Sequence, residues 1–456
     1  MELKLHDVPT FICHQYIDDI NGYKLYYNPL GYGGITVVGI ESQNLVKLCD
    51  GSHTVEQILQ LENRPITQVL EELNILAEKE IVNISNDFTQ ELHKNSRSKG
   101  SISCWMHLTN SCNLACSYCY IHKSPGEMTL EIGKLAIDKM LQSCASHNIR
   151  EMNIKFAGGE PLLRFGLLKQ LVDYSQKTKG EISVTYTVLT NGILITKQIA
   201  NYLKQNHIGI GVSLDGVGAI NDSCRHYKNG EGSFSRVIEG IGILREVGIK
   251  PSIMTTVSYS NYRNLLDLTK FLLEGEYRFR FSLERDCISG LPELLNHTNE
   301  LIESLNECYD YIEQNLPKEN FTKLHTFGDV GFNKPSKKSC GAGSNFFSIG
   351  HDGKLGVCGL GLAEPFSKLE AENDLLNCVR TINPELATNV ASSYPKCNSC
   401  VWRKSCAGGC PLQTKATFGK YDHYSPYCEV YWKILPRVLR IKGLQMIRNF
   451  EQDSSN

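Results

Sequence analysis

The chain has 456 residues, is 41% hydrophobic and carries a formal net charge of −2. This length predicts two or three domains with a large core, and the nearly balanced charge excludes a bulk nucleic-acid binder. The sequence has no apolar N-terminal segment of the signal-peptide kind and no apolar run of about 20 residues, which predicts a cytoplasmic protein without a membrane partner.

Residues 1–86 are predicted to form a small α+β module. Tyr23–Tyr27 and Gly34–Val38 are rich in β formers, and Thr54 with Gln57 makes a capping box ahead of two helical patterns. A last short strand would complete a winged-helix-like order of elements. In the helical part, six acidic residues outnumber two basic ones, and this balance disfavours contact with nucleic-acid phosphates.

A polar stretch at residues 87–101 predicts a linker, and from 102 to 290 strand and helix patterns alternate. This alternation indicates an α/β fold with a parallel sheet covered by helices, and six repeats suit a partial (β/α)6 barrel. The predicted strands are Trp105–Leu108, Met152–Phe156, Ser183–Leu189, Gly209–Leu214, Pro251–Val257 and Tyr277–Leu283.

Residues 291–339 are predicted as a helical bridge and linker, with one long amphipathic helix running from about 290 to 316 and a basic stretch after it. Residues 340–456 are rich in Cys and Gly and poor in long periodic segments. This composition is typical of a domain that a metal holds together.

Cysteine is abundant, with 18 residues. In a chain without an export signal, clustered cysteines indicate metal binding or catalysis more than disulfides. Ten of them fall in spaced groups. We interpret the others as mostly buried small hydrophobic residues; they are Cys13, Cys49, Cys104, Cys144, Cys224, Cys287, Cys308 and Cys378.

Cys112, Cys116 and Cys119 directly follow the first predicted barrel strand, with C-x3-C-x2-C spacing. A [4Fe–4S] cluster normally takes four Cys ligands, so a loop with three leaves one iron open to an outside ligand. Barrel active sites lie at this end of the strands. Three unrelated thiols, or a zinc site that lacks a ligand, are the alternatives at this point.

Further candidates follow the next strands. Gly158-Gly159-Glu160-Pro161 comes after the second strand, where glycines let the backbone approach a ligand and a carboxylate can accept from an ammonium. An ordinary tight turn has the same composition. Asn191 ends the third strand, and Ser213 and Asp215 end the fourth.

Together these motifs resemble the radical S-adenosylmethionine (SAM) superfamily. The resemblance implies that SAM binds the open iron through its amine and carboxylate. It also implies that one electron splits SAM into methionine and a 5′-deoxyadenosyl radical, which abstracts an unactivated hydrogen atom. The Gly158–Pro161 run would bind the methionyl amine, Ser213 would lie near the ribose, and Asp215 and Asn191 would line the site.

The resemblance adds two less specific candidates. Tyr118 would pack near the cluster and the adenine, with plain core packing as the alternative. Arg225 is a candidate partner for the SAM carboxylate, with a solvated surface arginine as the alternative.

A second set of cysteines lies in the last part of the chain. Zinc could be held by the four between 397 and 410, but that leaves three others unexplained. The pattern resembles the SPASM extension of radical SAM enzymes that modify peptides and proteins, which implies two auxiliary [4Fe–4S] clusters and three clusters in all. By position, the first auxiliary site is Cys340, Cys358 and Cys410, and the second auxiliary site is Cys397, Cys400, Cys406 and Cys428.

These assignments give seven ligands where two clusters need eight, because residues 341–347 contain no Cys. Either Cys378 supplies the eighth ligand or one iron is open. An open iron could bind a substrate cysteine as thiolate and accept an electron while a carbon radical closes onto sulfur. Our hypothesis is that such an iron supports formation of a thioether bond.

The segment Leu48–Ile58 resembles the PqqD-like element that holds leader peptides of ribosomally made peptides, often by strand addition, with a structural cap as the alternative. The order of the front module, the barrel and the Cys-rich tail resembles that of sactipeptide maturases, which form thioethers from Cys sulfur to an α-carbon. Expected partners are a precursor peptide with a leader and a low-potential donor of the flavodoxin or ferredoxin type. The alternatives are an anaerobic sulfatase-maturating (formylglycine-forming) enzyme, a peptide epimerase, a carbon–carbon cross-linking maturase and a non-catalytic iron–sulfur or zinc scaffold.

Overall fold

The computed structural model describes residues 3–12, 16–84, 100–121, 123–287, 290–316, 327–328, 336–382, 384–388 and 390–453. Of the predicted linker at 87–101, residues 87–99 lie outside this part of the chain. So do Cys13 and the beginning of the basic stretch that precedes residue 336.

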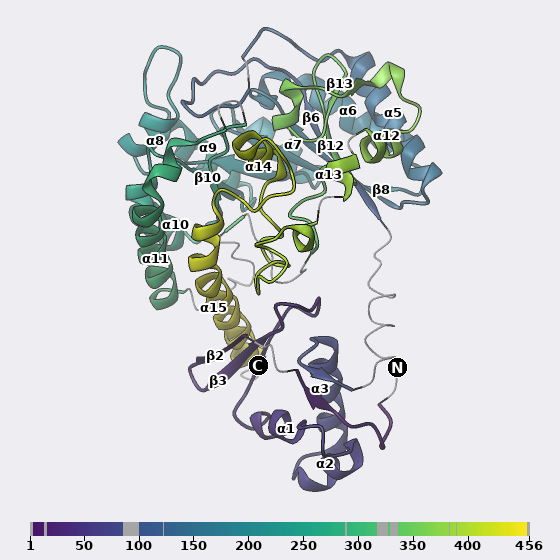
Figure 1. Cartoon of the computed structure of the whole chain (residues 1–456). Coiled ribbons are helices and arrows are strands. Elements are labelled where there is room, and N and C mark those ends of the chain that lie inside the picture. Colours follow the sequence, from purple (N-terminus) through teal and green to yellow (C-terminus); the bar gives the residue numbers. More distant parts are fainter. Residues whose placement is uncertain are drawn as a thin grey trace.

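A nine-stranded sheet lies in the upper half of the molecule as Figure 1 shows it, with the strand order β11-β10-β9-β8-β7-β6-β12-β13-β14. The six predicted barrel strands are confirmed and pair in parallel, each with the next along the chain. They are β6 (Ser101–His107), β7 (Glu151–Ala157), β8 (Ser183–Thr190), β9 (Gly209–Ser213), β10 (Ser252–Val257) and β11 (Arg278–Leu283).

The last part of the chain extends this sheet. Strand β12 (Phe346–Ile349) pairs in parallel with β6, and β13 (Lys354–Gly356) and β14 (Ser367–Lys368) continue it in antiparallel pairing. Their residues Phe347, Ile349 and Leu355 are buried in the same core as the barrel strands. The Cys-rich tail is therefore joined to the barrel through main-chain hydrogen bonds as well as side-chain packing.

Helices follow the barrel strands, as the alternating pattern predicts. They are α5 (Leu130–Ser146), α6 (Phe165–Thr178), α7 (Lys197–Gln205), α8 (Ala219–Cys224), α9 (Phe234–Glu246) and α10 (Leu265–Glu274). The side chains of Thr129 and Thr196 cap α5 and α7 by accepting a hydrogen bond from the third residue after each cap. Each long helix buries one apolar face against the sheet, as Leu168 and Leu171 of α6 do.

The bridge helix begins later than predicted. A short 3-10 turn, η3 (Glu293–His297), precedes the helix α11 (Thr298–Gln314). Gly290 has a left-handed φ of +80°, and Pro292 has no N–H to donate, so the α-helix cannot extend back to residue 290.

The front module contains an antiparallel sheet and three helices. The strands β2 (Tyr16–Ile20), β3 (Tyr23–Tyr27) and β4 (Ile35–Val38) are followed by α1 (Gln43–Leu48), α2 (Val55–Leu61) and α3 (Ile66–Glu78). The closing strand β5 (Val82–Asn83) pairs with β1 (Thr10–Phe11). The predicted capping box is confirmed: Gln57 N donates to Thr54 Oγ1 (3.2 Å), and Thr54 N donates to Gln57 Oε1 (2.8 Å).

This module packs against the long C-terminal helix α15 (Cys428–Asp453), which runs from the tail down to β2 and β3 (Figure 1). The packing is close, because a Cβ at Gly443 would lie 2.3 Å from Leu25 Cδ1. Tyr27 joins it to the Cys-rich tail through a buried hydrogen bond with Ser405 (2.6 Å) and by stacking on Trp402. One face of the front sheet therefore belongs to the main core.

The remaining described elements of the tail are short. They include α12 (Leu375–Thr381), α13 (Pro384–Thr388) and α14 (Pro411–Phe418), joined by turns. Across the described residues, no helix combines the length and the apolar character that crossing a membrane requires.

Candidate active site

The three-cysteine loop follows β6 at the carboxyl edge of the parallel strands, as predicted. The Gly158–Pro161 turn holds its first residues: Gly159 N donates to Thr109 O (2.7 Å), and Glu160 N donates to Ser111 O (2.9 Å). A Cβ at Gly159 would lie 2.1 Å from Ser111 O, and Gly158 has φ +126°. The close approach that the two glycines permit is thus to the backbone of the cysteine loop.

The end of α8 and the residues after it hold the other side of the same loop. Ala115 N donates to His226 O (2.8 Å), and Ser117 N donates to Cys224 O (3.3 Å). Lys123 donates to Leu114 O (2.7 Å). The loop is therefore fixed from both flanks by main-chain contacts, which suits a site that must hold a cofactor in one position.

The structure brings the three predicted thiols together. The thiol of Cys116 interacts electrostatically with both Cys112 and Cys119. Cys112 Sγ accepts from Leu114 N (3.4 Å), and the amide of Asn191 lies 3.9 Å from the same sulfur. Burial raises the pKa of the Cys112 and Cys116 thiols, so binding of iron at these sulfurs releases protons.

Glu160 is buried, and donors within the chain already occupy its carboxylate. Oε1 accepts from Thr190 Oγ1 (2.7 Å) and Leu162 N (3.1 Å), and Oε2 accepts from Asn191 N (2.9 Å). Burial raises the pKa of Glu160, while these hydrogen bonds oppose that effect. Glu160 therefore joins the ends of β7 and β8, and Pro161 beside it is buried at the start of a 3-10 turn, η1 (Pro161–Arg164).

The partly buried Tyr118 of the loop contacts Asp215 and Arg225, which are both buried. Arg225 Nη1 lies 3.1 Å from Asp215 Oδ2, and the Tyr118 hydroxyl donates to Asp215 and accepts from Arg225. Asp215 Oδ1 accepts from Thr256 N (2.9 Å). The alternative of a solvated surface arginine is wrong for Arg225, which is buried. Its Nε has no hydrogen-bond partner among the described residues.

Two buried asparagines position Asp215, and the sequence did not single them out. Asp215 N donates to Asn221 Oδ1 (3.2 Å), and Asn261 Nδ2 donates to Asp215 O (2.9 Å). No local motif marks them, because their partners come from other elements. Ser213, the last residue of β9, is partly buried at the same carboxyl edge of the sheet.

The four thiols assigned to the second auxiliary site also gather. Cys406 interacts electrostatically with Cys397, Cys400 and Cys428. A turn places the first two, with Cys400 N donating to Cys397 O (3.1 Å), and Cys428 begins α15. Three consecutive residues with positive φ, 407 to 409, then lead the chain to Cys410.

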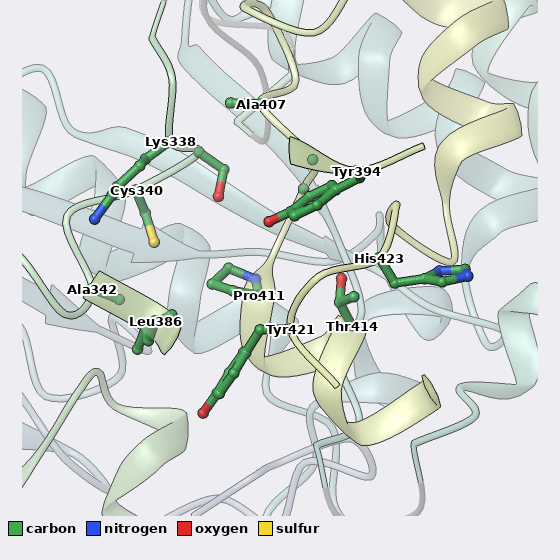
Figure 2. A pocket seen from close by; sticks show the side chains of 13 residues that line it. Lys338, Cys340, Ala342, Leu386, Tyr394, Ala407, Pro411, Thr414, Tyr421 and His423 are labelled. Carbon is green, nitrogen blue, oxygen red and sulfur yellow. The ribbon is translucent and has the colours of Figure 1, made fainter. Parts of the chain in front are cut away.

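The three thiols of the first auxiliary site lie near one another as well. Cys358 interacts electrostatically with Cys410 and Cys340. Figure 2 shows Cys340 in a pocket that Pro411 and Thr414 of α14 also line, together with the rings of Tyr394 and Tyr421. Cys340 is exposed.

The eighth-ligand candidate from the sequence, Cys378, is buried in the tail. It belongs to α12, and its electrostatic neighbours are Glu372 and Asp374. Cys287, which we interpreted as a small core residue, is instead only partly buried and interacts with Cys410 and Cys358.

One aromatic residue connects the three-cysteine loop with the first auxiliary site. Tyr120 follows Cys119 directly, and a Cβ added at Gly359 would lie 2.8 Å from the Tyr120 hydroxyl oxygen. Cys358 and Cys119 are both electrostatic neighbours of the Tyr120 hydroxyl. The two groups of cysteines therefore approach each other across this ring.

The donor set suits iron–sulfur clusters. Among the described residues, no three His, Cys, Asp or Glu side chains are arranged around a point that a single metal ion would occupy. A [4Fe–4S] cluster makes a different demand, because each thiolate binds a separate iron of a larger body. Groups made only of thiols, held by turns and glycines, meet that demand.

Comparison with known proteins supports a [4Fe–4S] cluster and SAM at the three-cysteine loop. Residues 106–272 match the radical SAM superfamily. The uncharacterized protein MJ0907 of Methanocaldococcus jannaschii is 33% identical over 235 residues, which are 50% of this chain and 79% of that protein. A cysteine-type anaerobic sulfatase-maturating enzyme of Clostridium novyi is 26% identical over 349 residues, 71% of this chain and 91% of that enzyme.

Among solved structures, Streptococcus suis SuiB bound to its precursor peptide SuiA has a similar fold. The TM-score is 0.52 at 16% identity, and the match covers 91% of this chain and 98% of SuiB. The similarity thus includes more of the chain than the barrel alone.

Proposed function

Because this chain belongs to the radical SAM superfamily, we propose that it is a maturase that installs a thioether, from Cys sulfur to an α-carbon, in a ribosomally made precursor peptide. The observation that carries the proposal is the three-cysteine loop at the carboxyl edge of the sheet, fixed by main-chain contacts on both flanks. The chain is related to maturases that act on peptides or proteins, and the solved structure of SuiB holds a precursor peptide.

We assign Cys112, Cys116 and Cys119 to the [4Fe–4S] cluster that binds SAM. When bound, this cluster and SAM supply the electron and the 5′-deoxyadenosyl radical that takes a hydrogen atom from the substrate. The chain's own contribution is to hold the thiols in place, with the amide of Asn191 beside Cys112.

The SAM contacts follow from the groups that remain available. The Nε–H of Arg225 is buried without a partner among the described residues, which supports a role in binding the SAM carboxylate. Asp215 and Tyr118 keep the guanidinium oriented. Glu160 already accepts three hydrogen bonds, so we assign amine binding to the main chain of the Gly158–Pro161 run, with Ser213 near the ribose.

The two auxiliary sites, each with a [4Fe–4S] cluster, would handle the second electron. Joining S–H and Cα–H into S–Cα removes two hydrogens: one leaves as an atom to the 5′-deoxyadenosyl radical, and the other leaves as a proton and an electron. The cysteines of the auxiliary sites would hold a cluster that could accept that electron, and a low-potential donor of the flavodoxin or ferredoxin type would reduce the SAM-binding cluster. The free thiols of the described residues suit a cytoplasmic, reducing location.

The front module, residues 1–86, would bind the leader of the precursor as a PqqD-like element. Its strand β2 lies at the edge of a three-stranded sheet, and Ile17 on it is 45% exposed. Main-chain pairing with such an edge is a common mode of peptide recognition. Residues 102–290 would be the SAM-binding barrel, 291–339 the bridge, and 340–456 the SPASM domain.

Mass spectrometry of a precursor peptide from the neighbouring coding region, co-expressed with the enzyme, tests this function. Loss of two hydrogens per link, with fragmentation that places the link between Cys sulfur and an α-carbon, supports it. An unchanged mass, with or without inverted stereocentres, contradicts it. The matched control is Cys116→Ala, which should yield neither modified peptide nor 5′-deoxyadenosine.

A second candidate is oxidation of a Cys or Ser in a protein substrate to formylglycine. It is favoured by the alignment with the Clostridium novyi sulfatase-maturating enzyme, which covers 91% of that protein. The same measurement separates the two: formylglycine formation from Cys removes the sulfur, and formylglycine formation from Ser places the loss of two hydrogens on one residue, whereas a thioether retains the sulfur and links two residues.

A further inference from the structure

The loop after β11 is fastened to the Cys-rich tail at both of its ends. At one end, Tyr427 donates its hydroxyl to Glu284 O (2.9 Å). At the other, Gly290 O accepts from Gln413 Nε2 (3.1 Å) and from the hydroxyl of Thr417, both on α14. A loop that leaves the barrel is thus held against the helix that begins immediately after Cys410.

The fit at the second end is close. Gly290 has φ +80°, and a Cβ there would lie 2.2 Å from Ala416 O. Any other residue would push the loop away from α14, so the glycine fixes how near the loop comes to this helix.

Cys287 stands between these two attachments, three residues from each. Its thiol lies within electrostatic range of the thiols of Cys410 and Cys358. The guanidinium of Arg285 is a neighbour of both Cys287 and Cys340. Cys287 is therefore near two members of the first auxiliary site and shares Arg285 as a neighbour with the third, Cys340.

We propose that Cys287 is the fourth protein ligand of the cluster at the first auxiliary site. This inference rests on the proposed function, because it assumes that Cys340, Cys358 and Cys410 hold an iron–sulfur cluster. On binding, the Cys287 thiol gives its proton to solvent, and its sulfur replaces a solvent ligand on the fourth iron; no electron moves in this step.

The fourth ligand changes what the cluster can do. With four thiolates it has no open iron for a substrate cysteine, so it acts as an electron acceptor and the substrate sulfur does not bind to it. Thioether formation remains possible, because the departing electron needs only an acceptor. The cluster would also join the end of β11 to the tail, and its binding free energy would stabilise the contact between them.

The chain provides a matched control in Cys378. It is a buried thiol in α12, and its electrostatic neighbours are the carboxylates of Glu372 and Asp374. We suggest comparing Cys287→Ser and Cys378→Ser in the full-length chain in which Cys112, Cys116 and Cys119 are all Ala, so that only the auxiliary clusters contribute. After anaerobic reconstitution, this parent should bind about eight irons.

The readouts are iron content and the electron paramagnetic resonance signal of the reduced protein. Cys287→Ser should lose or alter the signal of one auxiliary cluster, and added 2-mercaptoethanol should shift an altered signal back toward that of the parent. Cys378→Ser should match the parent. A Cys287→Ser protein with the parent's signal and no response to thiol would overturn the assignment.

A second measurement needs no substitution and so does not depend on how a variant folds. Iodoacetamide labelling of the otherwise native chain, read by peptide mass spectrometry, should modify Cys287 after iron is removed and spare it after reconstitution. Equal labelling in both states would also overturn the assignment. If both auxiliary clusters bind without Cys287, only the ligand assignment fails and the proposed function stands. If neither the native chain nor its variants bind iron, the ligand assignment and the proposed function both fail.

Discussion

Replacing Gly159 by Ala should disable the SAM-binding site through the backbone alone. The added Cβ would lie 2.1 Å from Ser111 O and 2.8 Å from Asn110 O, and neither carbonyl can rotate away as a side chain could. The turn and the cysteine loop must therefore separate by about 1 Å, which endangers the hydrogen bonds of Gly159 N and Glu160 N. Overpacking and the loss of these bonds should cost about 3 kcal/mol.

Gly242→Ala is the matched control. Gly242 lies inside α9, is exposed, and has no atom within 4 Å of an added Cβ, so Ala should stabilise the helix by about 0.5–1 kcal/mol. The two alanines thus predict opposite signs of change in stability.

The assay combines thermal unfolding with formation of 5′-deoxyadenosine from SAM under strong reductant. Gly159→Ala should unfold at a lower temperature than the parent and lose most of its SAM cleavage, while Gly242→Ala should keep the parent's cleavage rate and unfold no earlier. If Gly159→Ala cleaves SAM as fast as Gly242→Ala, then the turn does not position the loop as we describe.

Three further changes have outcomes of known sign. Asp215→Ala leaves the buried Arg225 guanidinium uncompensated and should lower the free energy of unfolding by about 3–5 kcal/mol, measured by chemical unfolding. Adding Arg225→Met to the same chain should restore part of this loss. Equal losses in the single and the double variant would contradict the prediction. Burial lowers the pKa of His107 to about 4 from about 6.5. The stability gained by keeping His107 neutral is therefore complete above about pH 6.5, and it falls by about 3 kcal/mol as the pH drops to about 4. His107→Leu should flatten this pH dependence of unfolding, and an unchanged pH profile would argue against the reasoning. Tyr27→Phe removes the hydrogen bond to the buried Ser405 hydroxyl and should lower the free energy of unfolding by about 1 kcal/mol. Proteolysis between the front module and the tail should become faster. Unaltered proteolysis would show that this contact does not hold the module.

The barrel strands were predictable because they are rich in β-forming residues and because helical patterns separate them. Buried positions such as Ile102, Cys104 and Met106 alternate along β6 with less buried ones, as expected of a strand that turns one face to the core. The joining of tail and barrel was not predictable. Strand β12 has only four residues, and its pairing with β6 depends on chain segments more than 200 residues apart.

Motif spacing located the three-cysteine loop but not the role of each neighbouring side chain. For Glu160, local sequence suggested an acceptor for a ligand, whereas its partners Thr190 and Asn191 come from the next strand. For Arg225, burial depends on how the segment after α8 folds over the cysteine loop. Hydrogen bonds between distant segments decide both cases, and a single sequence does not encode them in any local pattern.

The choice between Cys378 and Cys287 also depends on contacts between segments that are distant in sequence. From the sequence, Cys378 was the natural candidate, because it lies among the tail cysteines, and Cys287 seemed to belong to the barrel. Yet Cys287 comes four residues after β11 ends at Leu283, on the carboxyl edge where the sheet places its functional loops. A cysteine at that edge is close in space to anything that packs over it, however far away in sequence. The position relative to the strand end is therefore the signal that favours Cys287, once the tail is expected to cover this edge.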